Sequence, residues 1–308
     1  MGDLVVVKFG KFLLACSVAL SLLVPTAVSA TASPVVSAAT TSASNSDSPA
    51  AGENAPKTPT KAQKAKQKAK KKAAAKKAKK KAAKLAAKQA KAAEKKARAK
   101  AKAKPELSSG SSGKQVATLQ KLLRKRGFWV SKADGKYGHS TQQAVMAVQK
   151  ATGRARTGRA TQGVWYELYL GTRVETDISK SKSKDKRVFE VDLSRQILNV
   201  VKDGKVLWTF NISTGSNRNY FDNGVRGYAH TPTGTFKVFL KRDYMHVAKL
   251  GPMYRPQYFR SGGWAIHGSP NIPAYPASHG CVRIANAAMD YLWGKGKLGI
   301  GSTVVVHK

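Results

Sequence analysis

A stretch of almost nothing but lysine and alanine, residues 61–104, most constrains how this chain can fold. Lysine and alanine both favour helix, but lysines at neighbouring helical positions repel one another. We therefore expect a disordered spacer, extended or transiently helical, that takes no part in a hydrophobic core. The globular structure has to form in the residues that follow.

The same stretch carries much of the net charge of +40, which is far above that of an ordinary globular enzyme. A basic segment of this kind attracts anionic polymers, a membrane surface or, inside a cell, nucleic acid. A solvated spacer without a partner is the alternative. The export signal predicted at the N-terminus argues against nucleic acid.

The first 30 residues have the pattern of an export signal. Two lysines precede an apolar run, residues 12–24, and Pro25 ends the run. Small residues at 27–30 suit a signal peptidase, so we predict cleavage near Ala30 and a secreted protein. The run of about 13 residues is short of the roughly 20 that span a bilayer, but a retained anchor stays open. A lipoprotein signal at Cys16 fits less well, because the apolar run continues past it.

Composition also divides the rest of the N-terminal third. Residues 31–60 are rich in Ser, Ala, Thr and Pro, and a segment with so few apolar side chains cannot offset the entropy of ordering. We assign residues 1–30 to the signal peptide and 31–110 to a disordered linker, first Ser/Pro-rich and then Lys/Ala-rich.

Three short amphipathic helices are predicted within residues 113–171. Apolar residues recur there at helical spacing, and Gly127 suits the C-terminus of the first helix. Thr141 suits the N-cap of a second helix that extends to Gly153, and a third follows Thr161. Three helices in so few residues form a small three-helix bundle.

This helical segment resembles the peptidoglycan-binding type 1 domain. The residues that carry the resemblance are Gln120 to Leu123, Asp134-Gly135-Lys136-Tyr137-Gly138, Thr141, Ala144, Val145, Gln149, Gly158 and Trp165. The resemblance implies that the turn residues line a groove for glycan or peptide, which makes peptidoglycan the expected partner. A purely structural helical spacer is the alternative.

Beyond a second linker, residues 172–186, the apolar pattern changes from helical spacing to alternation. Strands are predicted over 188–193, 196–201, 205–212, 236–240, 264–266 and 303–306, and one helix over 286–293. Asp203-Gly204 is a hairpin signal between the second and third strands. We expect residues 187–308 to form a mainly β, β-sandwich-like catalytic domain, so the chain is multidomain.

The residues suited to catalysis lie in the C-terminal half of this β domain. A predicted strand ends at His267, and a Gly- and Pro-rich loop leads on to Cys281, the only cysteine left after signal cleavage. An imidazole near a thiol either lowers its pKa or removes its proton, so the pair suits nucleophilic catalysis. Main-chain N–H groups at Gly280 and Cys281 would form an oxyanion hole, with His279 as a second donor or as a residue that orients the loop.

Around this pair the sequence resembles the L,D-transpeptidase catalytic domain of the YkuD type, over about 186–306. The matching residues are His267-Gly268, Ser278-His279-Gly280-Cys281-Val282-Arg283, Asp192 to Gln196, Ser213-Thr214-Gly215 and Thr231 to Phe236. The interval between His267 and Cys281 is slightly short for the family, which predicts a trimmed lid.

The resemblance implies a two-step acyl transfer in cell-wall biogenesis. Cys281 would attack the carbonyl between the third residue of a stem peptide, a diamino acid, and the fourth, D-Ala, and would release D-Ala. The amine of a second stem, or of an acceptor protein, would resolve the thioester and form a 3-3 cross-link. His267 would act as base and then as acid. No cofactor and no metal are expected.

The resemblance also suggests roles for neighbouring residues. The Gly268 carbonyl would orient His267, and Arg283 would hold a substrate carboxylate through its bidentate fork. The other candidates for substrate contact are Ser278, Trp264, Tyr254 and Phe259; the three aromatic residues suit either cleft walls or core.

Three other functions remain open at this stage. A papain-like peptidase or another wall-peptide hydrolase or carboxypeptidase would also use a cysteine, although in papain-like enzymes the cysteine precedes its histidine. His267, His279 and Cys281 are conceivable zinc ligands, but no further ligand stands at a recognised spacing. A non-catalytic wall-binding protein is the third.

Overall fold

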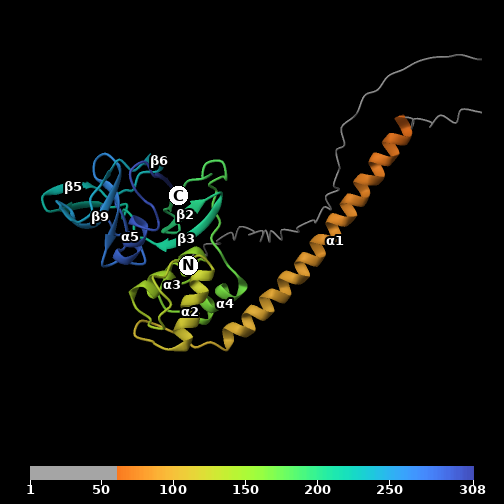
Figure 1. Ribbon diagram of the computed structural model, residues 1–308, viewed down its shortest axis with the longest axis horizontal. Helices are drawn as coiled ribbons and strands as arrows, with labels where there is room; N and C mark the ends of the chain where they lie inside the picture. The colour runs from red at the N-terminus through yellow and green to blue at the C-terminus, as the bar shows by residue number, and fades with distance from the viewer. Residues whose placement is uncertain (1–60) are drawn as a thin grey trace, which may run out of the picture. The chain divides into compact units, whose positions relative to one another are not determined.

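The computed structural model describes residues 61–308 (Figure 1), with the side chain of residue 64 excepted. The predicted signal peptide and the Ser/Pro-rich segment lie outside the described residues. The chain divides into two units, residues 1–90 and 91–308. From residue 61 onward, no helix combines the length and the apolar character that crossing a membrane requires.

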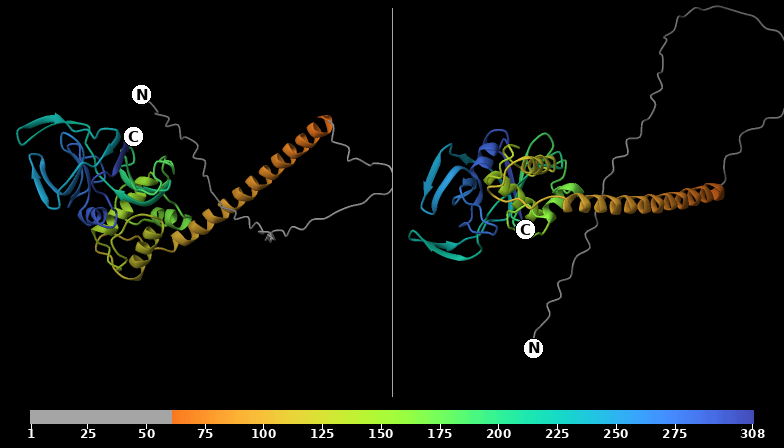
Figure 2. Two further views of the ribbon diagram at one scale, coloured as in Figure 1. Left: turned by 45° about the horizontal axis from the view of Figure 1, so that its top comes forward. Right: turned by 90° about the horizontal axis from the view of Figure 1, so that it is seen from below.

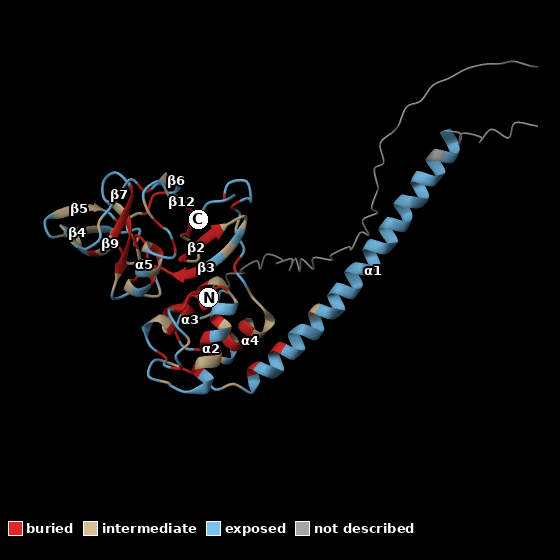
Figure 3. Cartoon of the chain, in the orientation of Figure 1, coloured by how far each residue is buried: buried red, intermediate tan, exposed pale blue. Residues whose placement is uncertain are grey.

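The Lys/Ala segment forms a continuous α-helix, α1 (Lys61–Lys102), so the expectation of a disordered segment is wrong for these residues. The high helix propensity of both residue types, added over 42 residues, outweighs the repulsion between lysines. Nearly all of α1 is exposed (Figure 3). Within the second unit its last turns gain contacts: Ala97 and Ala101 are buried, and the Arg98 guanidinium lies 5.5 Å from the centre of the Tyr166 ring.

The three helices predicted after residue 113 are present as α2 (Lys114–Lys125), α3 (His139–Ala151) and α4 (Gln162–Leu170). They share one hydrophobic core, whose largest members are Leu119, Leu123, Phe128, Trp165 and Leu168. The helix α3 begins at His139 and not after Thr141, which corrects the predicted N-cap.

Thr141 serves the turn between α2 and α3 instead. The buried Gln120 side chain donates to the Thr141 hydroxyl (2.9 Å) and to Asp134 Oδ1 (3.0 Å), and its carbonyl accepts from the Gly135 N–H (2.9 Å). One glutamine thus ties together the turn that carries the wall-binding resemblance, because each of its polar atoms has a partner there.

The remainder of the chain forms two five-stranded sheets, a hairpin and one helix. The strands are β1 (Val188–Asp192), β2 (Ile197–Lys202), β3 (Lys205–Asn211), β4 (Asn219–Asp222), β5 (Val225–Tyr228), β6 (Gly234–Lys237), β7 (Leu240–Lys241), β8 (Met245–Ala248), β9 (Gly251–Arg260), β10 (Trp264–Ser269), β11 (Val282–Ala285) and β12 (Thr303–His307), and the helix is α5 (Asn286–Trp293). One sheet has the order β3-β2-β1-β12-β6, and the other has β11-β10-β9-β7 with β8 paired to β9. Side chains of both sheets and of α5 build one core.

Most predicted elements of this domain are confirmed, and the predicted helix at 286–293 coincides with α5. The predicted strand at 236–240 is wrong in its bounds, because β6 ends at Lys237 and a separate strand, β7, begins at Leu240. The hairpin β4–β5 and the strands β8, β9 and β11 were not predicted. Two prolines inside β9, Pro252 and Pro256, argue against a strand, and β4, β5 and β8 have no buried face that would impose alternation.

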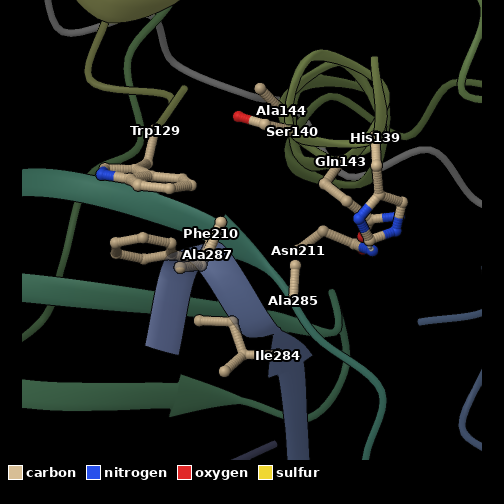
Figure 4. A pocket seen from close by; sticks show the side chains of 11 residues that line it. Trp129, His139, Ser140, Gln143, Ala144, Phe210, Asn211, Ile284, Ala285 and Ala287 are labelled. Atoms are coloured by element: carbon tan, nitrogen blue, oxygen red, sulfur yellow. Dashed lines mark hydrogen bonds between the residues drawn. The ribbon is translucent and has the colours of Figure 1, made fainter. Parts of the chain in front are cut away.

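The helical region and the β domain are joined through backbone and side chains alike. After α2, the Trp129 N–H donates to the Thr209 carbonyl (3.1 Å), and the Thr209 N–H donates to Gly127 (2.7 Å), so this loop lengthens the sheet at β3. The Trp129 ring enters the core of the β domain, with its centre 5.5 Å from that of Phe210. Figure 4 shows this seam, which encloses a cavity of only about 20 Å³.

Replacing the tryptophan at this seam tests whether the two regions unfold together. Trp129→Ala should lower the free energy of unfolding by about 3–5 kcal/mol, the usual cost of removing a large aromatic side chain from a core. Urea denaturation followed by circular dichroism measures the change. Leu85→Ala, at an exposed site in α1, is the control and should change stability by less than about 0.5 kcal/mol. A Trp129→Ala protein as stable as the wild type would show that the seam carries little of the stability.

Candidate active site

The strands β10 and β11 bring the predicted catalytic pair together. They run parallel and pair Ile266 with Val282 and His267 with Arg283. Because side chains alternate along a strand, Ile266 and Val282 point into the core, while His267 and Arg283 share the opposite face. Cys281, one residue before β11, falls on that same face, at the diagonal position from His267.

This face forms the floor of a cleft of about 860 Å³, which both His267 and Cys281 line. Two hairpins, β4–β5 and β8–β9, border the cleft and project from the β domain (Figure 2). Their turns meet where the Asn223 side chain donates to the Lys249 carbonyl at 3.0 Å. The loop from 270 to 280 joins β10 to the nucleophile, and the walls of the cleft come from these two hairpins.

The imidazole of His267 is buried and has a defined tautomer. Its Nδ1 lies 2.9 Å from the Gly268 carbonyl. A carbonyl can only accept, so Nδ1 carries the hydrogen and Nε2 carries the lone pair. Burial lowers the pKa of His267 to about 4, and the positive charge of Arg283 acts in the same direction, against the raising effect of the Gly268 carbonyl. The ring is therefore a neutral base at pH 7.

The thiol of Cys281 is also neutral at rest. Burial raises its pKa, although the N–H of Ala265 and the charge of Arg283 act to lower it. The residue is half-buried, with its sulfur turned inward so that the thiol donates to the Gly263 carbonyl at 3.3 Å. Between residues 61 and 308, no hydrogen bond links this thiol to His267, so the side chain has to rotate before proton transfer.

The loop before Cys281 has its shape imposed by Ser278 and Gly280. Gly280 has φ of 147°, and a Cβ there would lie 2.8 Å from both the His230 carbonyl and the Trp264 indole nitrogen. Its N–H donates to Ser278 Oγ (3.0 Å), and that hydroxyl donates to the Cys281 carbonyl (2.6 Å). The Gly280 amide is thus occupied, whereas the Cys281 N–H has no partner among residues 61–308.

The other predicted polar residues divide into two groups. Arg283 lines the cleft, and within residues 61–308 its guanidinium has no carboxylate partner; burial lowers its pKa. His279 lies 3.4 Å from Asp222 and faces the hairpin β4–β5, with its ring centre 4.5 Å from that of Tyr220. Arg283 therefore presents a positive charge without a counter-ion to the cleft. His279 connects the nucleophile loop to the hairpin.

Of the three aromatic residues expected at the substrate, only Trp264 lines the cleft, where its indole N–H donates to the His230 carbonyl at 2.9 Å. Phe259 is 2% exposed and belongs to the core. Tyr254 packs over Gly268, and its hydroxyl donates to Asp290 at 2.9 Å. Of the two alternatives that the sequence left open, Phe259 therefore takes the core position, and Tyr254 packs against the core and does not line the cleft.

Sequence reasoning missed Tyr258, a cleft residue close to the nucleophile. It pairs with Ala265 across β9 and β10, and the small alanine allows Tyr258 and Cys281 to share one apolar cluster. Burial raises the pKa of Tyr258, against the lowering effect of the Arg242 charge. Only the pairing register identifies this residue, and the prolines of β9 concealed that register.

His267, His279 and Cys281 were the conceivable zinc ligands. From residue 61 to the C-terminus, no group of three or more His, Cys, Asp and Glu side chains is placed to hold a metal ion.

Two protein families match the chain: the L,D-transpeptidase catalytic domain over residues 186–306, and a peptidoglycan-binding domain over residues 112–168. The crystal structure of an L,D-transpeptidase from Xylanimonas cellulosilytica DSM 15894 is 44% identical, with a TM-score of 0.62, and the match covers 67% of this chain and 98% of that chain. An L,D-transpeptidase from Stackebrandtia nassauensis is 25% identical, with a TM-score of 0.39, over 66% of this chain and 95% of that chain.

A curated relative matches a smaller part of the chain. An N-acetylmuramoyl-L-alanine amidase from Bacillus licheniformis is 50% identical over 54 residues, which are 17% of this chain and 15% of the amidase. The chain thus spans a small fraction of that enzyme's length.

The pH dependence of alkylation tests whether thiol and imidazole are neutral at rest. With the pKa of Cys281 raised and that of His267 lowered, iodoacetamide should react slowly at pH 7, and the rate should still rise above pH 9. Mass spectrometry of the intact protein measures the rate, and Cys281→Ala is the unlabelled control. His267→Gln should leave the profile nearly unchanged. A rate plateau between pH 5 and 8 would instead reveal a thiolate–imidazolium pair.

Proposed function

Because the chain belongs to the L,D-transpeptidase family, we propose that it is a peptidoglycan L,D-transpeptidase that acts at the cell wall. One observation carries the proposal: parallel pairing of β10 and β11 places Cys281 and His267 on the same face, at the floor of one cleft. A nucleophile and a base on adjacent strands, open to a ligand, are what acyl transfer through a thioester requires.

In the first step, the Cys281 thiol turns from Gly263 toward His267, and the neutral Nε2 accepts its proton. The sulfur attacks the carbonyl between the diamino acid and D-Ala of a donor stem. Charge develops on the carbonyl oxygen, and the unpartnered Cys281 N–H is available to donate to it. The carbon–nitrogen bond then breaks, the imidazolium returns the proton to the leaving amine, and D-Ala departs.

In the second step, an acceptor amine attacks the thioester carbonyl while His267 again takes a proton. The carbon–sulfur bond breaks, the thiol is restored by the imidazolium proton, and a 3-3 cross-link results. The histidine returns to its neutral state after each step, so its low pKa suits a base that has to be ready at neutral pH.

Arg283 is proposed to bind a carboxylate of the donor stem. Its guanidinium lines the cleft on the same face as Cys281, is partly buried and lacks a carboxylate partner within residues 61–308. A planar guanidinium binds a carboxylate through two parallel hydrogen bonds, which would orient the scissile carbonyl over the sulfur.

The helices α2, α3 and α4 are proposed to form a three-helix wall-binding domain. Support comes from their shared core, from the family match over residues 112–168 and from the turn organised by Gln120. Secretion through a signal peptide cleaved near Ala30 would bring both domains to the wall.

The helix α1 is proposed to bind an anionic wall polymer. Its exposed lysines surround the helix, and it presents no apolar stripe that would enter a membrane. A linear polymer with repeated phosphate groups complements such a surface along its whole length.

The acyl-transfer proposal predicts the behaviour of a Cys281→Ala protein. Purified wild-type protein incubated with tetrapeptide muropeptides should release D-Ala and form a thioester adduct and cross-linked products, all visible by mass spectrometry. Cys281→Ala should lose all three while still pelleting with isolated walls. His267→Gln should lower kcat by roughly 10²–10⁴-fold.

The same assay tests Arg283. Arg283→Gln should raise KM for the tetrapeptide and slow the alkylation of Cys281 at neutral pH, because the Arg283 charge helps to lower the pKa of the thiol. If the wild type releases D-Ala but forms no cross-link, water is the acceptor and the protein is a carboxypeptidase. D-Ala release by Cys281→Ala would exclude the cysteine mechanism.

Charge removal on α1 tests the proposed polymer contact. Changing the lysines at 70–72 and 79–81 to glutamine should weaken pelleting with walls severalfold at low salt and have no effect at high salt, because exposed charges are screened. Walls stripped of phosphate polymers should bind the wild type and this variant equally. Equal binding of both proteins to intact walls would contradict the contact, and stronger binding to anionic vesicles would assign α1 to the membrane surface.

A further inference from the structure

A lysine of the helical region is buried against the β domain. Lys150, near the end of α3, is 2% exposed, and its Nζ donates to the carbonyls of Ile212 (2.8 Å) and Gln196 (3.4 Å). Among residues 61–308 no carboxylate pairs with it, and burial lowers its pKa to about 7. A buried amine without a counter-ion is costly, so its two contacts need a reason.

One acceptor of the Lys150 amine is the Gln196 carbonyl. The side chain of Gln196 connects it to the loop before Cys281. Gln196 lies in the turn between β1 and β2 with φ of 59°. Its side chain donates to the Thr214 hydroxyl (2.7 Å) and accepts from the Thr214 N–H (2.9 Å). The Thr214 carbonyl in turn accepts from the Ser278 N–H at 2.9 Å. Ser278 is the residue whose hydroxyl holds Gly280 and Cys281.

The other acceptor of the Lys150 amine, the Ile212 carbonyl, is connected to β11, the strand that follows Cys281. Ile212 is followed by Ser213, which exchanges two backbone hydrogen bonds with Arg283 (3.1 and 2.9 Å). Arg283 is two residues after Cys281 and lies in β11. The two chains of contacts that start at the Lys150 amine therefore reach Ser278, three residues before the nucleophile, and Arg283, two residues after it.

We propose that Lys150 is a positioning residue, through which the helical region holds the loop of Cys281 in its reactive geometry by way of Gln196, Thr214 and Ser278. The inference rests on the proposed acyl transfer and extends it, because the wall-binding domain then contributes to the chemical step as well as to location. A loop displaced by about 1 Å is enough to lower such a rate on the order of 10²-fold.

The seam itself does not depend on Lys150. Gln143, two helical turns before Lys150 in α3, accepts a hydrogen bond from the Asn211 side chain (2.5 Å). Trp129 also packs in the core of the β domain. Figure 4 shows Gln143 and Asn211 meeting between α3 and β3. Removing the amine should therefore leave the two regions docked, which separates positioning from docking.

The test compares full-length Lys150→Met with the wild type. Methionine keeps the apolar stem and removes the donors. We expect kcat for tetrapeptide turnover to fall at least tenfold, KM to stay within twofold, and wall pelleting to be unchanged. Amide hydrogen exchange at residues 277–281 should accelerate at least tenfold. Lys150→Arg, which can still donate to both carbonyls, should recover most of the activity, and the exposed Lys125→Met should match the wild type.

A second variant keeps the test decisive if Lys150→Met folds poorly. Thr214→Val removes the hydroxyl that Gln196 reaches, and should also lower kcat and accelerate exchange at 277–281. The double variant should lose no more than the more affected single variant, since both changes break one chain of contacts. Multiplied losses, or wild-type kcat and exchange in Lys150→Met, would overturn the proposal. If the wild type releases no D-Ala, the proposed function fails, and exchange at 277–281 still reports on the positioning.

Discussion

The parallel pairing of β10 with β11 is the contact on which the active site depends. It fixes which side chains face the core and which face the cleft, because alternation along two paired strands leaves no freedom once Ile266 and Val282 are buried. His267 and Cys281 share one face as a consequence of the core, and a shift of one residue in this register would turn one of the two side chains away from the cleft. Catalytic geometry and domain stability thus share one cause.

The electrostatics follow from the same burial. A thiol and an imidazole held in a partly closed cleft are both driven toward their neutral forms, and the Gly268 carbonyl determines which ring nitrogen can act as base. The enzyme therefore generates its thiolate only as substrate arrives. A permanently charged sulfur, in contrast, would be more open to oxidation.

The sequence was sufficient for the elements with a strong periodic pattern and for the residues of a recognisable motif. The helix at 286–293, the hairpin at Asp203-Gly204 and the pair His267 and Cys281 follow from local rules. The two hairpins at the cleft could not be predicted, since β4, β5 and β8 have no buried face and two prolines interrupt the pattern of β9. Lys150 escaped notice because a lysine near a helix end is normally solvated, and its burial arises from contacts 46 and 62 residues away.

The hydrogen bond between Asn223 and Lys249 joins the turns of the two hairpins that border the cleft. A neutral hydrogen bond of this kind contributes only about 1 kcal/mol to stability. This contact between the two walls is therefore weak beside the strand pairing that fixes the floor, and the width of the cleft can change while β10 and β11 keep their register.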